Sequence, residues 1–252
     1  MMLCIDCGNT RIKWGLHNGR QWLEQGALLL TEIDRLPGLF ASLPLPAQVI
    51  ACNVASDEVR DLVQAAVAAL GLPLIWAVSR AQQCGVKNTY DDPAQLGADR
   101  WAALIGARHV HAGPCLVVNA GTATTVDVLD AAGVFQGVLI LPGVSLMRTA
   151  LSRDTARLPL AAGVFSPLPR NTADAIASGS LQATLGAIIR MFAQIAASPA
   201  AICLLSGGAA GALEPLLQAP LRRIDNLVLE GLAQMIQASY IDKAPHSLPK
   251  IG

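Results

Sequence analysis

Residues 6–13, DCGNTRIK, decide the fold of this chain, and they follow the apolar run at 3–5. The apolar run predicts a buried strand over residues 2–6. The alternation of apolar and polar residues after the turn predicts a second strand over 11–17. A charge at the end of a buried strand is costly unless it is paired or binds something, so Asp6 indicates a site.

Further elements follow from turn and capping signals. Asn18-Gly19 is a strong hairpin signal and predicts a third strand over 21–30. Ser56 is a good N-cap for an amphipathic helix that ends at Gly71. The other expected elements are strands at 48–54, 72–78, 116–120, 125–129, 134–141 and 201–205, and helices at 101–111, 144–157, 172–197, 209–218 and 225–240.

The opening pattern occurs a second time. LVVNAGTATTVDVL (116–129) aligns without a gap with LCIDCGNTRIKWGL (3–16), so that Gly8 matches Gly121, 113 positions later. In both stretches apolar residues precede a polar one, Asp6 or Asn119, and a glycine turn follows. We therefore expect an internal duplication, with one α/β lobe over 1–113 and another over 114–252.

The repeated turns have the chemistry of a phosphate site. Gly8 lets the backbone approach a ligand, and Lys13 adds a positive charge on the next strand. Asp6 cannot contact phosphate favourably alone, so it predicts a magnesium ion, which binds one or two carboxylates together with phosphate oxygens. The turns at 121–125 and 206–208 offer further donors and room for a base or ribose. The alternative is that all are ordinary glycine turns, but two matched copies favour the phosphate site.

Asp99, in the sequence Gly97-Ala98-Asp99-Arg100, has two interpretations. It is well placed to be the N-cap of the following helix. Alternatively, its carboxylate takes the proton from an attacking hydroxyl while Arg100 holds an acidic substrate. Spacing alone leaves both interpretations open and favours the cap.

Composition narrows the class of protein. Of 252 residues 53% are hydrophobic and 14% charged, with 18 basic and 18 acidic residues, which predicts a large core and no nucleic-acid surface. The first residues do not resemble a signal peptide, and no stretch predicts a transmembrane helix. We expect a cytoplasmic protein. Cys4 and Cys7 form a C-x-x-C, but they should lie on opposite faces of a strand, which favours packing over zinc or redox chemistry.

Taken together, the residues resemble the type III pantothenate kinases, the family that also contains the Bvg accessory factor. The resemblance rests on these motifs, in order: DCGNT (6–10), Tyr90, GADR (97–100), GTATT (121–125), Asp127, Pro142-Gly143, NTADAIASG (171–179), SGG (206–208) and LVLEGL (227–232). GADR followed by GTATT is the most specific pair. The resemblance implies the acetate and sugar kinase/Hsp70/actin-like fold, with two ribonuclease-H-like lobes and an ATP cleft between them. It also implies transfer of the γ-phosphate of ATP to pantothenate, the first step of coenzyme A biosynthesis.

The resemblance also implies roles for individual residues. Asp99 matches the family's general base. The positions that match pantothenate contacts are Tyr90, Gly97, Ala98, Arg100 and Thr172. Those that match ATP contacts are Asp6, Cys7, Gly8, Asn9, Thr10, Arg11, Ile12, Lys13, Gly121, Thr122, Gly207 and Gly208, with Asp6 on magnesium, directly or through water. The family works as a homodimer and uses a monovalent cation, K⁺ or NH₄⁺.

One departure concerns that cation. The family usually has aspartate where this chain has Asn119. An amide oxygen still ligates potassium but brings no charge, so we expect the cation requirement to be weaker or to be met by Asp127. Two alternative functions predict different residues. A non-catalytic regulator of the same fold should have lost Asp6 or Asp99, and another sugar kinase or ATPase of the superfamily should lack the GADR element.

Overall fold

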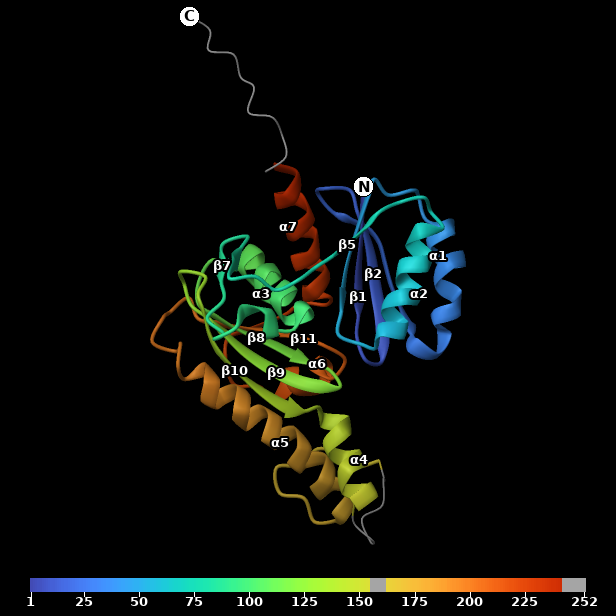
Figure 1. Ribbon diagram of the computed structural model, residues 1–252. Coiled ribbons are helices and arrows are strands. Elements are labelled where there is room, and N and C mark those ends of the chain that lie inside the picture. The colour runs from blue at the N-terminus through green and yellow to red at the C-terminus, as the bar shows by residue number, and fades with distance from the viewer. Residues whose placement is uncertain (155–161, 242–252) are drawn as a thin grey trace, which may run out of the picture. The chain divides into compact units, whose positions relative to one another are not determined.

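A computed structural model describes residues 1–154 and 162–241 of the chain. The chain forms two compact units, each assembled from separate stretches of sequence (Figure 1). Unit 1 comprises residues 1–84, 96–106 and the chain from 228 onward, and unit 2 comprises residues 85–95 and 107–227. Each unit contains one five-stranded sheet.

The sheet of unit 1 has the strand order β3-β2-β1-β4-β5. Its strands are β1 (Met2–Cys7), β2 (Arg11–His17), β3 (Trp22–Leu29), β4 (Gln48–Asn53) and β5 (Leu74–Trp76). One face packs against η1 (Leu30–Arg35), α1 (Leu36–Ser42) and α2 (Asp57–Ala68) around a core that includes Ile5, Trp14, Phe40 and Val63. The 3-10 helix η1 and α1 were not expected from the sequence.

The predicted helix cap and glycine turns of unit 1 are confirmed. The Ser56 side chain accepts a hydrogen bond from the Val59 amide at 3.4 Å, as the N-cap of α2. Gly71 ends this segment with φ +72°, and Gly19 in the β2–β3 hairpin has φ +99°. Cys7 packs in the core that α1 and α2 cover.

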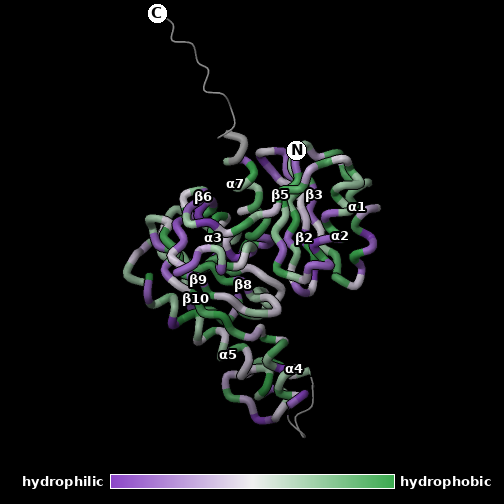
Figure 2. The backbone as a smooth tube through the Cα atoms, in the orientation of Figure 1, coloured by the Kyte–Doolittle hydropathy of each residue, from purple (hydrophilic) through white to green (hydrophobic). Residues whose placement is uncertain are grey.

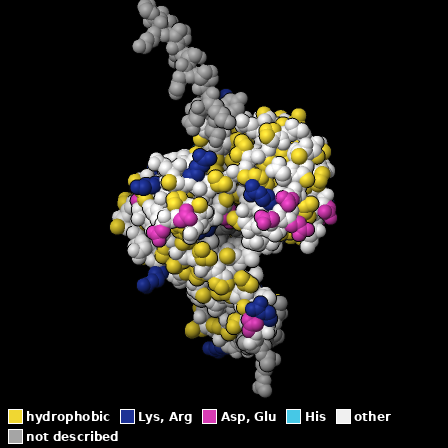
Figure 3. All heavy atoms as spheres, viewed as in Figure 1, with side chains coloured by type: hydrophobic (Ala, Val, Ile, Leu, Met, Phe, Trp, Pro, Cys, Tyr) yellow, Lys and Arg dark blue, Asp and Glu magenta, His cyan; other side chains and the backbone are white. Residues whose placement is uncertain are grey.

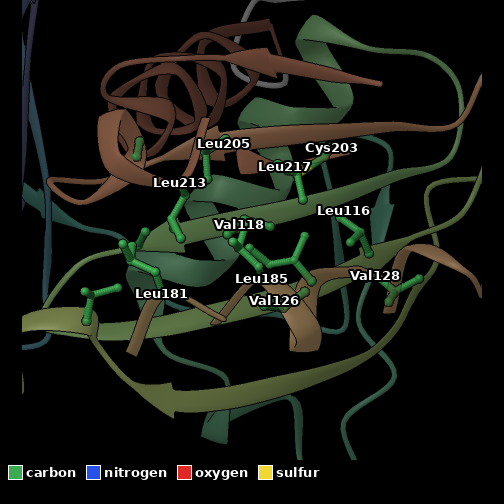
Figure 4. Close-up of a cluster of buried hydrophobic side chains, with 14 of the residues drawn as sticks. Leu116, Val118, Val126, Val128, Leu181, Leu185, Cys203, Leu205, Leu213 and Leu217 are labelled. Atoms are coloured by element: carbon green, nitrogen blue, oxygen red, sulfur yellow. The ribbon is translucent and has the colours of Figure 1, made fainter. Parts of the chain in front are cut away.

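The sheet of unit 2 has the order β10-β9-β8-β11-β12. Its strands are β8 (Cys115–Ala120), β9 (Ala123–Leu129), β10 (Phe135–Pro142), β11 (Ile202–Ser206) and β12 (Leu221–Arg223). The core lies between this sheet and α5 (Thr172–Phe192), α6 (Ala210–Leu213) and η3 (Glu214–Leu216). Figure 4 shows Leu185 of α5 beside Val118 and Val126 of the sheet, and Figure 2 shows hydrophobic residues running along the strands of both sheets.

The two five-stranded sheets have matching strand orders, as the predicted duplication requires, because each strand of the first sheet has a counterpart in the same place in the second. The gapless alignment is wrong by one residue, however. Asp6 pairs with Lys13, whereas Asn119 pairs with Thr125. The second turn is therefore one residue shorter, and Lys13 corresponds in position to Thr125.

The boundaries of the units differ from the continuous lobes expected at 1–113 and 114–252. The reason is that residues 228–241 belong to unit 1, although they follow unit 2 in the sequence. Helix α7 (Leu227–Ile241) packs on unit 1, where the Trp22 indole N–H donates to the Glu230 carboxylate at 2.6 Å. A hairpin of β6 (Gln82–Gln83) and β7 (Val86–Lys87), followed by η2 (Pro93–Gln95), lies where a plain loop was expected.

Helix α3 (Ala98–Val110) begins three residues before the predicted start, and its first part belongs to unit 1 and its end to unit 2. Helix α4 (Val144–Asp154) was predicted to reach residue 157, which lies outside the described residues. By length and composition α5 is the one described helix that could cross a membrane. Its residues Leu181, Leu185 and Ile188 are buried in the core of unit 2, as in a core helix.

Candidate active site

The first predicted phosphate segment forms a tight turn at the edge of the sheet in unit 1. Asp6 is the last residue but one of β1, and its Cα faces that of Lys13 across the antiparallel pair. The Gly8 amide donates to the Arg11 carbonyl at 3.1 Å and closes the turn. On the parallel side, the Cys52 thiol donates to the Asp6 carboxylate at 3.5 Å. Asp6 therefore lies between a cation and a neutral donor.

The pKa of the Asp6 carboxyl group is strongly raised. Its pKa is raised to about 6, first by burial and then by the negative charge of Asp99, while Lys13 and the Cys52 hydrogen bond oppose the shift. Coulomb interactions act over several ångströms, so the Asp99 charge is part of the electrostatic environment of Asp6 within unit 1. Perturbed carboxylates of this kind are concentrated at functional sites.

The start of α3 decides between the two interpretations of Asp99. The helix begins at Ala98, and the Gly97 carbonyl accepts the helical hydrogen bond from the Trp101 amide at 2.9 Å. The expectation that Asp99 is the N-cap is therefore wrong, because Asp99 lies inside the first turn. Its carboxylate accepts from the Arg100 amide at 2.7 Å.

The surroundings of Asp99 suit a proton acceptor. Burial raises its pKa, against the lowering effect of the hydrogen bond from the Arg100 amide and of the Arg100 charge. A Cβ at position 97 would lie 2.8 Å from the Asp99 Oδ1 atom, so Gly97 leaves the space that this carboxylate occupies. Arg100 is 8% exposed, which brings a cation into the same buried region.

In unit 2 three segments converge at the end of β8. The Gly143 amide donates to the Thr122 carbonyl, and the Ala209 amide donates to the Ala120 carbonyl, both at 2.9 Å. Gly207 has φ +100°, and a Cβ there would lie 2.5 Å from the Ala120 carbonyl oxygen. Both the conformation and the close approach require glycine. The structure thus brings the predicted turns at 121–125 and 206–208 together.

Polar residues line one face of this sheet beside the turn. Asn119 of β8 is paired with Thr125 of β9 and with Ser206 of β11. The Thr125 hydroxyl is buried without a hydrogen-bond partner, so an oxygen ligand is available next to the Asn119 amide. Asp127, two residues further along β9, is 2% exposed and lies on the same face.

The remaining predicted substrate residues belong to unit 2. Tyr90 lies in the loop between β7 and η2, with its ring 5.5 Å from the ring of Phe135. Thr172 is the first residue of α5 and follows the N-cap Asn171. It lines a hollow of about 1250 Å³ that is bounded by α4 and the first half of α5. Gly97, Ala98, Asp99 and Arg100, in contrast, belong to unit 1.

Two residues that contact predicted site residues, Cys52 and Asn88, were not predicted from the sequence. Cys52 became apparent only through its pairing opposite Asp6, and a thiol inside an apolar strand carries no sequence signal of its own. Asn88, which holds the loop of Tyr90, is one polar residue among many between 82 and 95.

Comparison with known proteins identifies the family. The family model described as type III pantothenate kinase matches residues 2–194. The chain belongs to the type III pantothenate kinase family. A type III pantothenate kinase of Aromatoleum aromaticum is 56% identical over 92% of this chain and 96% of its own length, and one of Azoarcus sp. is 47% identical over 97% and 94%.

Solved structures agree with the fold expected for a type III pantothenate kinase. A Baf family transcriptional activator from Campylobacter jejuni superposes with a TM-score of 0.62 at 18% identity, covering 95% of this chain and 99% of its own. A 2-dehydro-3-deoxygalactonokinase from Sinorhizobium meliloti gives 0.58 at 14% identity, with full coverage of both chains. The chain therefore has the α/β fold of the acetate and sugar kinase/Hsp70/actin superfamily.

Proposed function

We propose that this chain transfers the γ-phosphate of ATP to the primary hydroxyl of pantothenate, forming 4′-phosphopantothenate in the first step of coenzyme A biosynthesis. Membership of the type III pantothenate kinases supports the reaction. The single observation that carries it is the pair of carboxylates in unit 1, with Asp6 opposite Lys13 at the glycine turn and Asp99 in the first turn of α3, where the Asp99 charge acts on Asp6. Asp6 suits a site for a metal ion and phosphate, and Asp99 suits a base that accepts the proton of the hydroxyl attacking phosphorus.

In this proposal Asp99 is the general base and accepts the proton of the pantothenate hydroxyl. Its raised pKa brings the carboxylate closer to the operating pH, where a base is most effective. Arg100 is the partner for the pantothenate carboxylate, because a guanidinium binds a carboxylate through paired hydrogen bonds. Tyr90 and Thr172, which lie in unit 2, are the other proposed substrate contacts, with Gly97 and Ala98 leaving room beside the base.

ATP is proposed to bind through the two glycine turns. In unit 1 the turn of residues 7–12 and the Lys13 ammonium surround one end of the polyphosphate. In unit 2 Gly121 and Thr122 contact the other end. Gly207 and Gly208 are proposed to let the nucleoside approach; a Cβ at Gly208 would have no atom within 4 Å, while the space beside Gly207 is occupied by the Ala120 backbone.

Magnesium fits this arrangement. Among the described residues, no three His, Cys, Asp or Glu side chains form a self-contained metal site. Magnesium bound with a nucleotide needs only one or two carboxylates in addition to phosphate oxygens, and Asp6 supplies one. When bound, the ion neutralises phosphate charge. The chain's own contribution is to hold Asp6 between Lys13 and Cys52, directly opposite the turn.

A monovalent cation, K⁺ or NH₄⁺, is proposed at Asn119 and Thr125. The support is the unpartnered, buried Thr125 hydroxyl next to the Asn119 amide. Both ligands are neutral, so we expect weaker dependence on the cation than a carboxylate would give, with Asp127 as the nearest negative charge on that face.

A homodimer in the cytoplasm completes the proposal. The hollow between α4 and α5 is bordered by exposed apolar side chains, among them Leu146 and Leu151, which are 43% and 40% exposed. Figure 3 shows hydrophobic side chains gathered over this part of unit 2. An apolar surface rimmed by polar residues is typical of a protein–protein interface, and we expect a second copy of the chain to cover it.

The test is ADP release by purified protein with magnesium-ATP and pantothenate, with and without potassium or ammonium. We expect release to require pantothenate, and Asp99→Asn to lower kcat by about 10²–10⁴-fold while the fold and pantothenate binding are retained. Turnover without an acceptor or a preference for hexoses would support a different kinase, and no turnover under any cation would support a regulator. An unfolded or fully active Asp99→Asn variant would refute the role of Asp99.

A further inference from the structure

The loop that carries Tyr90 is held by one buried amide. Asn88 is only 6% exposed, although it lies in a loop. Its Nδ2 atom donates to the Pro93 carbonyl at 3.1 Å, and its Oδ1 atom accepts from the Tyr90 amide at 3.0 Å. One side chain thus connects both ends of the 90–93 turn, using a donor and an acceptor at once.

The same loop is attached to the start of β10 at two further points. The Thr89 hydroxyl donates to the carbonyl of Phe135. The Tyr90 ring lies against the Phe135 ring at a centroid distance of 5.5 Å and an interplanar angle of 43°. Phe135 itself is fully buried, so it is a fixed support for the tyrosine.

The base of the loop is equally well fixed. The Lys87 amide donates to the Gly133 carbonyl at 2.9 Å. A Cβ at Gly133 would lie 2.1 Å from the Gly85 carbonyl oxygen, so the β6–β7 hairpin and the β9–β10 hairpin are in close backbone contact. Asp130 orders the β9–β10 turn by accepting from the amides of Ala132 and Val134 at 2.9 and 2.8 Å.

We propose that Asn88 is a positioning residue that presets Tyr90 for the acceptor and thereby sets the affinity for pantothenate. This inference rests on the proposed function, in which Tyr90 contacts the acceptor. A loop that is ordered before binding does not lose that freedom when the substrate arrives, so its contacts contribute more fully to affinity. Asn88 has no direct part in the chemistry.

The two hydrogen bonds of Asn88 explain why this position holds asparagine. The position requires a donor directed at Pro93 and an acceptor directed at Tyr90. Alanine provides neither group, and aspartate provides only the acceptor and brings a carboxylate next to a carbonyl. A buried group that loses its partner is left unsatisfied at a cost that lowers the population of the ordered loop.

The test is Asn88→Ala, with KM measured separately for pantothenate and for ATP. Loss of two hydrogen bonds should raise KM for pantothenate about 10-fold and leave KM for ATP within about twofold. Hydrogen exchange of the Tyr90 amide should become faster. Asn18→Ala is the matched control, because Asn18 accepts in the same way from the Arg20 and Gln21 amides in the β2–β3 hairpin, and it should leave both KM values unchanged.

A double-mutant cycle separates positioning from general destabilisation. In a Tyr90→Ala background, Asn88→Ala should add no further rise in KM for pantothenate, because the residue that it positions is gone. A full additional rise, or equal rises for ATP and pantothenate, would overturn the inference. So would an unchanged rate of exchange at Tyr90. A wild-type protein that does not phosphorylate pantothenate would instead refute the proposed function, and the exchange measurement would still decide whether Asn88 holds the loop.

Discussion

Replacing Gly231 by alanine tests a close contact between two helices of unit 1. A Cβ at this position of α7 would lie 1.7 Å from the carbonyl oxygen of Ala102 in α3, whereas Cβ contacts essentially never fall under 3.0 Å. The two backbones must therefore separate by about 1.3 Å, the difference between these distances. Overpacking of this kind costs about 1–3 kcal/mol, and the better helix propensity of alanine returns about 1 kcal/mol.

The same displacement reaches the proposed base. Asp99 lies three residues before Ala102 in α3, so a shift of the helix moves its carboxylate, and a misplacement of about 1 Å can lower the rate about 10²-fold. We expect Gly231→Ala to lower the free energy of unfolding by up to about 2 kcal/mol and kcat by about 10-fold or more. Urea unfolding and coupled ADP release measure the two effects.

Gly186→Ala is the matched control for this experiment. Gly186 is an exposed glycine inside α5, and a Cβ there would have no atom within 4 Å. Alanine at this position should raise stability by about 0.5–1 kcal/mol without changing kcat. If Gly231→Ala is also stabilised and fully active, the contact with Ala102 is looser than described and the reasoning is wrong.

Three further predictions concern the two turns. The pKa of Asp6 is raised from 3.8 to about 6, so the magnesium-free wild-type protein loses stability as the pH rises between these values. Asp6→Asn should therefore be more stable than wild type by about 1–3 kcal/mol at pH 7 and equal to it near pH 3.5. Urea unfolding in the presence of a chelator measures both differences. Thr125→Val removes an unpartnered buried hydroxyl, so it should raise the free energy of unfolding by about 1 kcal/mol in cation-free buffer while abolishing any activation by potassium; lower stability would count against the site. Gly207→Ala combines a left-handed conformation with a clash at Ala120 and should cost about 2–3 kcal/mol in thermal denaturation, whereas a neutral effect would contradict the close approach.

Most elements of both sheets could be predicted because their signals are local. Alternating apolar residues between glycine turns identify β1, β2, β8 and β9, and the Ser56 cap identifies α2. Helix α1 was missed because its seven residues, LPGLFAS, contain proline and glycine and show no helical period. Strand β12 has three residues, which is too short for a pattern to emerge.

The candidate site, too, could be predicted only where its signals are local in the sequence. Asp6 and Asp99 could be proposed because each is a charge in an otherwise apolar or glycine-rich context. The effect of the Asp99 charge on the pKa of Asp6 could not, since it depends on how β1 and α3 pack within unit 1. The register of the second turn was wrong because a gapless alignment cannot detect a turn that is one residue shorter, and only the pairing of Asn119 with Thr125 reveals it.

The return of α7 to unit 1 has a consequence for synthesis on the ribosome. Domains generally fold from the N-terminus as the chain emerges. Here the Trp22 indole and the backbone of Ala102 lack their partners until Glu230 and Gly231 have left the exit tunnel. All segments of unit 2, which ends at residue 227, emerge before that point. Of the two units, the one that begins first is therefore completed last, and a nascent chain that stops before α7 carries a proposed catalytic base in an unfinished unit.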